Sequence, residues 1–177
     1  MTETHPHSQT PSEWVVRWMH LMAKGGPVLD VACGGGRHAR LLAACGHPVW
    51  AVDRDSSALA SLAGVAGVTT LCADLEGGPW PYAGRSFCGI IVTNYLHRPL
   101  MAALVDALSV PGVLIYETFA VGNERYGRPS NPDHLLRPGE LLEVAQGRLT
   151  AVAYEQVHIS APRPAVVQRI CATRGAD

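Results

Sequence analysis

Lysine is nearly absent from this sequence: Lys24 is the only one among 177 residues. It precedes glycine, and no G-K-S or G-K-T triplet occurs, which excludes a Walker-type phosphate loop. The five cysteines contain no C-x-x-C pair and lie in apolar segments, so we expect neither a metal site nor a disulfide framework. No apolar run reaches the ~18 residues of a membrane helix, and no secretion signal is recognisable, so we expect a cytoplasmic protein without a membrane partner.

An excess of charge of one sign is also lacking. Lysine and arginine total 14 against 15 for aspartate and glutamate, which gives a net charge of −1 and no electrostatic reason for a nucleic-acid partner. Hydrophobic residues make up 47% and charged residues 16%, which excludes disorder as the main state. We expect a flexible tail at residues 1–12 and a single domain over residues 13–177.

The most informative stretch runs from Val28 to Arg40. A short β-favouring run leads into three consecutive glycines, Gly34 to Gly36, and then into a segment of helical composition. This pattern predicts a strand, a tight turn and a helix N-terminus. Free backbone N–H groups and the positive end of the helix dipole at such a turn favour a nucleotide-cofactor site.

Two cofactor types fit this turn. Gly34, Gly36 and Ala39 match the dinucleotide fingerprint G-x-G-x-x-A, which alone is a weak signal. With Asp53 as the ribose acid, this match would indicate an NAD(P)-dependent oxidoreductase. Asp30, four residues before the first glycine, and Cys33 favour a different cofactor.

The string Val-Leu-Asp-Val-Ala-Cys-Gly-Gly-Gly-Arg-His resembles the first motif of the class I S-adenosylmethionine-dependent methyltransferases, which commonly reads hydrophobic-hydrophobic-Asp-x-Gly-Cys-Gly-x-Gly. Ala32 departs from the usual first glycine but keeps a small side chain. In size and cofactor motif the chain is similar to the small tellurite-resistance-type and thiol methyltransferases. The resemblance implies S-adenosylmethionine as the cofactor and a small-molecule methyl acceptor.

The resemblance also assigns roles to residues after the second, third and fourth predicted strands. Asp53, 23 positions after Asp30, would bind the ribose hydroxyls. Asp74 would accept a hydrogen bond from the adenine amino group, and Leu75 would contribute its backbone N–H. The implied cofactor-binding residues are Asp30, Ala32, Cys33, Gly34, Gly36, Asp53, Arg54, Asp74, Leu75, Asn94 and Tyr95.

The pattern of apolar segments predicts an α/β fold. Strands are expected at residues 28–31, 48–53, 68–72, 87–93 and 113–116, with helices at 12–22, 37–45, 56–63, 99–108 and 138–145 and an antiparallel hairpin formed by 149–159 and 165–173. We expect a Rossmann-like, doubly wound sheet of seven strands, mostly parallel with an antiparallel C-terminal hairpin. This is the plan of the class I methyltransferases.

Candidate catalytic residues follow the fourth and fifth predicted strands. His97, Glu117 and His134 could act as a general base, with Tyr126 as a positioning group. The long polar segment 122–134 is a candidate substrate lid. Three functions are weighed: a small-molecule methyltransferase, an NAD(P)-dependent oxidoreductase, and a non-catalytic S-adenosylmethionine-binding or partner module.

Overall fold

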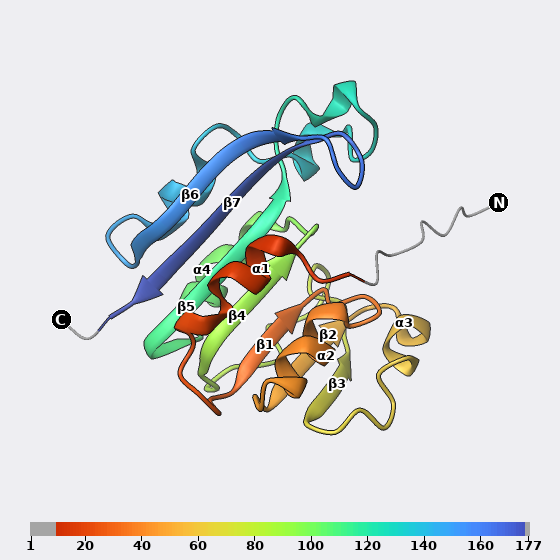
Figure 1. The fold of residues 1–177 in the computed structure, drawn as a ribbon, viewed down its shortest axis with the longest axis vertical. Coiled ribbons are helices and arrows are strands. Elements are labelled where there is room, and N and C mark those ends of the chain that lie inside the picture. Colours follow the sequence, from red (N-terminus) through yellow and green to blue (C-terminus); the bar gives the residue numbers. More distant parts are fainter. Residues whose placement is uncertain (1–9, 176–177) are drawn as a thin grey trace.

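One mixed sheet of seven strands organises the computed structural model, which describes residues 10–175 (Figure 1). The strand order is β3-β2-β1-β4-β5-β7-β6. The strands are β1 (Val28–Val31), β2 (Val49–Asp53), β3 (Val68–Cys72), β4 (Phe87–Thr93), β5 (Leu108–Phe119), β6 (Thr150–Ile159) and β7 (Ala165–Arg174). Strands β1 to β5 run parallel, while β7 is antiparallel to both β5 and β6. The predicted seven-stranded, Rossmann-like fold is confirmed.

Helices cover both faces of the sheet (Figure 1). Helices α1 (Glu13–Trp18), α2 (Arg37–Ala44) and α3 (Ser56–Ala60) supply apolar side chains to the core on one face, and α4 (Met101–Asp106) and α5 (Glu140–Ala145) supply them on the other. Four single turns of 3-10 helix complete the set: η1 (Met19–Leu21), η2 (Arg98–Leu100), η3 (Asn123–Arg125) and η4 (Pro132–His134). No helix within residues 10–175 is long and apolar enough to cross a membrane.

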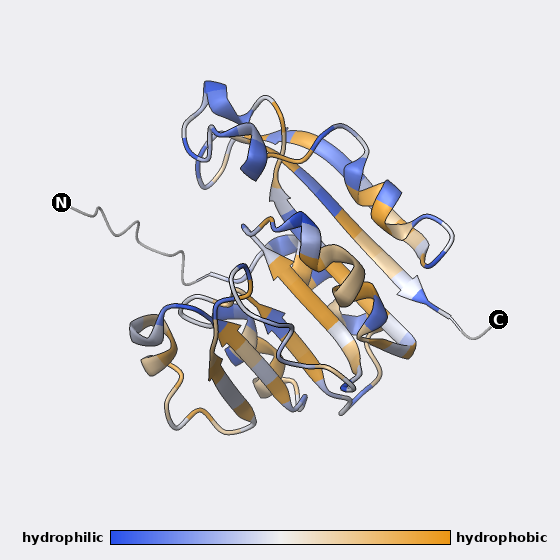
Figure 2. Ribbon diagram, turned by 180° about the vertical axis from the view of Figure 1, so that it is seen from behind, coloured by the Kyte–Doolittle hydropathy of each residue, from blue (hydrophilic) through white to orange (hydrophobic). Residues whose placement is uncertain are grey.

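The central strands are apolar because both of their faces are buried. All seven residues of β4 are buried, with Ile90 in the core on the α4 side and Ile91 in the core on the α1 side. Such a strand reads as a continuous apolar run rather than an alternating one. Figure 2 shows the inner strands as the most hydrophobic part of the ribbon, while the outer loops are hydrophilic.

Several predicted boundaries are wrong, among them the helix predicted at 99–108, which ends at Asp106 because Leu108 begins β5. The helix predicted at 12–22 is shorter: α1 begins at Glu13 with Ser12 as its N-cap and ends at Trp18, where η1 follows, and Leu21 is 37% exposed. The α3 helix ends at Ala60 instead of reaching residue 63. Of the predicted tail, residues 1–9 lie outside the described residues.

The predicted strand at 113–116 is part of a longer one. Strand β5 begins at Leu108, which pairs with Phe87, and pairing resumes at Val113 opposite Gly89, so the residues between them bulge out of the ladder. A second irregularity in β6 leaves Val152 between Ala151 and Ala153, whose partners on β7 are adjacent. The strand predicted at 149–159 therefore carries a bulge at Val152.

Candidate functional site

The turn between β1 and α2 has an unusual backbone. Ala32, Gly34 and Gly36 all have positive φ, at 51°, 53° and 72°. For an L-residue such as Ala32 this conformation costs roughly 1–2 kcal/mol. Gly36 is also required by packing, because a Cβ there would lie 2.4 Å from Cδ2 of the buried Leu62.

A pair of glycine variants tests how this turn is held. We expect Gly36→Ala to lower the free energy of unfolding by about 1–3 kcal/mol, because it adds left-handed strain to a clash with Leu62. Gly35→Ala is the matched control, since its Cβ would meet only Ser61 Oγ at 3.8 Å and its φ is not left-handed. Urea unfolding of both variants provides the measurement. Equal losses of stability would show that the packing against Leu62 does not distinguish the two positions.

Asp30 lies buried beneath the first turn of α2 and is 1% exposed. Its Oδ2 accepts a hydrogen bond from the Ala39 N–H at 3.0 Å, while its Oδ1 has no partner among the described residues. Burial raises the pKa of Asp30 to about 7, against the opposing effects of the Ala39 N–H and the Arg37 charge. The carboxylate is thus poorly compensated at neutral pH, which suits a nearby cationic group.

Asp53 joins the end of β2 to the glycine turn. Its Oδ2 accepts a hydrogen bond from the Gly34 N–H at 2.7 Å, and its Oδ1 accepts one from the Asp55 N–H at 2.9 Å. A carboxylate has about four acceptor positions, so both oxygens can still accept bonds from vicinal hydroxyl groups. The charge of Asp53 also contributes to the raised pKa of Asp30, which places the two acids at one site.

Asp74 follows β3 and is exposed at the same edge of the sheet. Its Oδ1 accepts a hydrogen bond from the Glu76 N–H at 3.0 Å. This bond, a second one from the Gly77 N–H and the charges of Arg54 and His97 lower its pKa. The adjacent Leu75 turns its side chain into the core.

Tyr95 brings the segment after β4 to the same edge. Burial raises the pKa of its hydroxyl to about 12, and the charges of Glu76 and Asp74 add to this effect. The preceding Asn94 has a φ of 55° and donates its N–H to the Glu117 carbonyl at 2.9 Å. The structure therefore gathers the predicted residues that follow β1, β2, β3 and β4 along one edge of the sheet.

The four candidate catalytic residues have different surroundings. The Glu117 carboxylate accepts hydrogen bonds from Ser12 Oγ at 2.8 Å and from Arg169 Nη1 at 3.0 Å, so it is held in an ion pair. Tyr126 is 49% exposed and lies against the His158 ring, with 4.7 Å between centroids. His134, on η4, is exposed. His97 is the candidate beside Asp74, a predicted cofactor residue.

His38 is a buried polar residue that the sequence reasoning missed. It is 1% exposed, and its Nε2 accepts the Ser12 N–H at 3.0 Å while its Nδ1 lies 3.5 Å from Thr93 Oγ1. Burial lowers the pKa of His38 to about 3, so the ring is neutral and carries its proton on Nδ1. Helical spacing could have indicated this burial, because His38 lies on the same buried face of α2 as Ala39 and Leu42.

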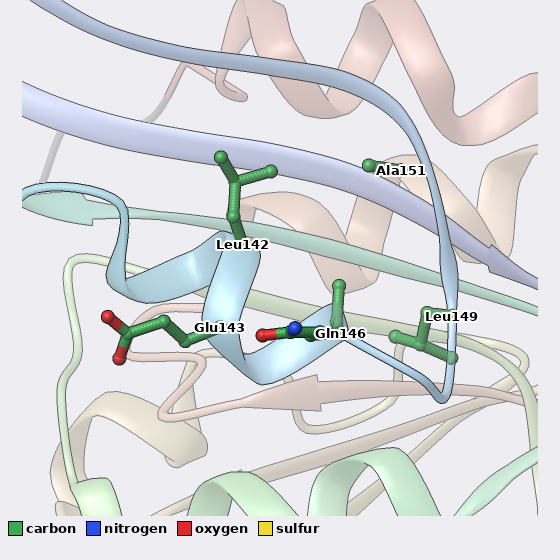
Figure 3. Close-up of a pocket in the computed structure, with 6 residues that line it drawn as sticks. Leu142, Glu143, Gln146, Leu149 and Ala151 are labelled. Atoms are coloured by element: carbon green, nitrogen blue, oxygen red, sulfur yellow. The ribbon is translucent and has the colours of Figure 1, made fainter.

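A groove lies away from this edge, between α5 and the beginning of β6 (Figure 3). Its volume is about 320 Å³, and it is lined by Leu142, Glu143, Ala145, Gln146, Leu149 and Ala151. Ala151 is level with Ala172 of β7 and, through it, with Leu114 in the middle of β5. The groove is therefore not at the carboxyl ends of the parallel strands, where ligands bind in open α/β sheets.

Comparisons with known proteins agree with this geometry. Residues 28–110 match a family model described as a methyltransferase domain. No curated protein matches the sequence significantly.

Solved structures resemble the chain in fold. TehB from Haemophilus influenzae has a TM-score of 0.74 at 15% identity, covering 96% of this chain and 64% of TehB, so this chain spans less than two thirds of that protein. An S-adenosylmethionine-dependent methyltransferase from Mesorhizobium loti has a TM-score of 0.69 at 17% identity, covering 90% and 96%. Coclaurine N-methyltransferase, bound to N-methylheliamine and S-adenosylhomocysteine, has a TM-score of 0.65 at 11% identity, covering 91% and 70%. Residues 28–110 thus match a methyltransferase-domain model, and the chain has the fold of solved S-adenosylmethionine-dependent methyltransferases.

Proposed function

We propose that this protein transfers a methyl group from S-adenosylmethionine to a small-molecule acceptor by direct displacement. The observation that carries the proposal is the row of acids, Asp30, Asp53 and Asp74, on three neighbouring parallel strands or just after them, beside a turn with positive φ. Asp30 would face the ammonium group, Asp53 the ribose hydroxyls and Asp74 the adenine amino group. When bound, S-adenosylmethionine supplies an activated methyl group.

The protein's own contribution is to bind and orient the two reactants. Holding a nucleophile in line at near-attack distance assists transfer by about 7 kcal/mol or more in favourable cases. A base is needed only for a nucleophile that arrives protonated. We propose His97 for this role, because Glu117 is engaged by Arg169 whereas His97 follows β4 at the cofactor edge.

A small acceptor is proposed because of a structural relative. Coclaurine N-methyltransferase was solved with the small molecule N-methylheliamine. The parallel strands end below the segment 120–136, which lies beside the β6–β7 turn (Figure 1). This segment and the residues after β4 would form the walls of the acceptor site.

Two assays test the proposal. In thermal-shift measurements we expect S-adenosylmethionine and S-adenosylhomocysteine to stabilise the protein, and stabilisation by NAD alone would support the oxidoreductase instead. With labelled S-adenosylmethionine and a panel of thiols, amines, phenols and carboxylates, we expect labelled product from at least one class. Tight cofactor binding without transfer to any acceptor would indicate a binding module rather than an enzyme.

A further inference from the structure

Arg98 makes the densest set of side-chain hydrogen bonds near the candidate acceptor site. It follows His97 and begins η2. Its Nε donates to Glu140 Oε1 at 2.7 Å and its Nη2 to Glu140 Oε2 at 3.0 Å, which is a two-pronged ion pair. The same guanidinium donates to the carbonyls of Asp133 and Leu135, both at 2.8 Å. One side chain thus joins the segment after β4 to the end of the segment 122–134.

Glu140, the partner of Arg98, is also held by several hydrogen bonds. It is the first residue of α5 and is 3% exposed. Its Oε2 also accepts the Arg137 N–H at 2.8 Å. Burial alone would raise the pKa of Glu140, but the hydrogen bonds from Arg98 and Arg137 lower it overall. A buried carboxylate with this many donors stays ionised and keeps its geometry.

The two segments that Arg98 joins are anchored at their other ends as well. Tyr116, 1% exposed, donates its hydroxyl to the Tyr95 carbonyl at 2.9 Å. Asn123, 2% exposed, donates to the Pro129 carbonyl at 3.0 Å and accepts the Val166 N–H at 3.2 Å. Each segment is therefore held to the sheet by its own hydrogen bonds, and Arg98 joins the two segments to each other.

We propose that Arg98 is a positioning residue for methyl transfer: its guanidinium sets the spacing between residues 94–97 and the segment 122–134, the two walls of the acceptor site. This inference rests on the proposed function. The role requires the planar fork of arginine, since lysine offers a point charge and cannot satisfy a carboxylate and two carbonyls in these directions. None of its partners is a residue assigned to the cofactor.

Hydrogen–deuterium exchange of Arg98→Ala tests the proposal. In the presence of S-adenosylhomocysteine, we expect amide exchange to become about tenfold faster or more in residues 94–97 and 122–136 together, with β1 to β4 unchanged. Arg148→Ala is the matched control, because it removes the exposed ion pair with Asp106 outside this site. Unchanged exchange in the two segments, or equally faster exchange over the whole sheet, would overturn the proposal.

Chemical rescue tests whether the guanidinium group itself sets the spacing of the two segments. Arg98 is a third exposed, so free guanidinium ions can reach the vacated place in Arg98→Ala. We expect millimolar guanidinium chloride, but not equal sodium chloride, to restore slow exchange in both segments, and we expect Arg98→Lys to remain fast. Millimolar guanidinium is far below the molar concentrations that unfold proteins, so slower exchange confined to the two segments would report guanidinium bound in the vacated place. Absence of rescue would contradict the positioning role.

Two further measurements, cofactor affinity and steady-state kinetics, relate the exchange result to catalysis. The affinity for S-adenosylhomocysteine should change less than about threefold in Arg98→Ala, because none of the hydrogen bonds that the variant loses reaches a residue assigned to the cofactor. With an acceptor that the wild-type protein methylates, KM for that acceptor should rise or kcat fall. If the wild-type protein does not bind S-adenosylhomocysteine, the proposed function fails. If it binds and the exchange in the two segments is unaltered, only the role of Arg98 fails.

Discussion

Asp30→Asn should become more stable relative to the wild-type protein by about 3 kcal/mol as the pH rises from 5 to 8. Burial raises the pKa of Asp30 to about 7 in the folded protein, from an ordinary value of 3.8. Between these values the folded chain holds a proton that the unfolded chain has lost, so wild-type stability falls as pH rises and levels off above pH 7. Asparagine does not ionise, so the stability of Asp30→Asn does not fall with pH for this reason.

Urea unfolding of both proteins at pH 5, 6, 7 and 8 measures this difference. All other titrating groups are common to the two chains, so subtracting one curve from the other isolates Asp30. Asparagine retains an oxygen for the Ala39 N–H but places an unpaired donor in a buried site, which is a cost that does not depend on pH. A stability difference that stays constant with pH would show that Asp30 does not titrate as its burial requires.

Gly34→Val is expected to abolish cofactor binding, a loss of at least about 3 kcal/mol or 100-fold. Gly34 has a φ of 53°, which a β-branched residue adopts only with strain, and its N–H is bonded to Asp53. A valine side chain would also occupy the space where the cofactor approaches the backbone. Isothermal titration with S-adenosylhomocysteine gives the affinity, and thermal unfolding checks that the variant is folded.

Asp53→Ala is the companion variant with a smaller expected effect. It should weaken binding by about 1–3 kcal/mol, the scale of lost hydrogen bonds to a charged group. Part of this loss would arise indirectly, because Asp53 also accepts the Gly34 N–H at 2.7 Å and so holds the turn. Unchanged affinity in both variants would place the cofactor site elsewhere.

The sequence was sufficient to predict the fold and to place the candidate site residues along one edge of the sheet. The apolar runs that form β1 and β4 are strands buried on both faces, and acids lie within or after several of the parallel strands, so the local sequence pattern was enough to place them. Asp53 and Asp74 lie at their predicted places because they sit at or just after strand ends. Asp30 lies on the predicted strand, but its side chain is buried beneath α2 and is not open at the end of the strand.

Residues whose roles depend on distant partners could not be predicted. Arg98 and Glu140 are 42 positions apart, and nothing local distinguishes them from other charged residues. Glu117 was a candidate base from its position on β5, but its environment is set by Arg169 on β7 and by Ser12 before α1. Long-range pairing of this kind depends on tertiary packing, which periodicity does not encode.

A structure determined with S-adenosylhomocysteine bound tests the central claim most directly. The account predicts the adenosyl group at the carboxyl ends of β1 to β3, with Asp53 on the ribose hydroxyls, Asp74 by the adenine amino group, and the sulfur facing the segment after β4. Density for the ligand in the groove between α5 and β6, or at any place out of reach of Asp53 and Asp74, would contradict it.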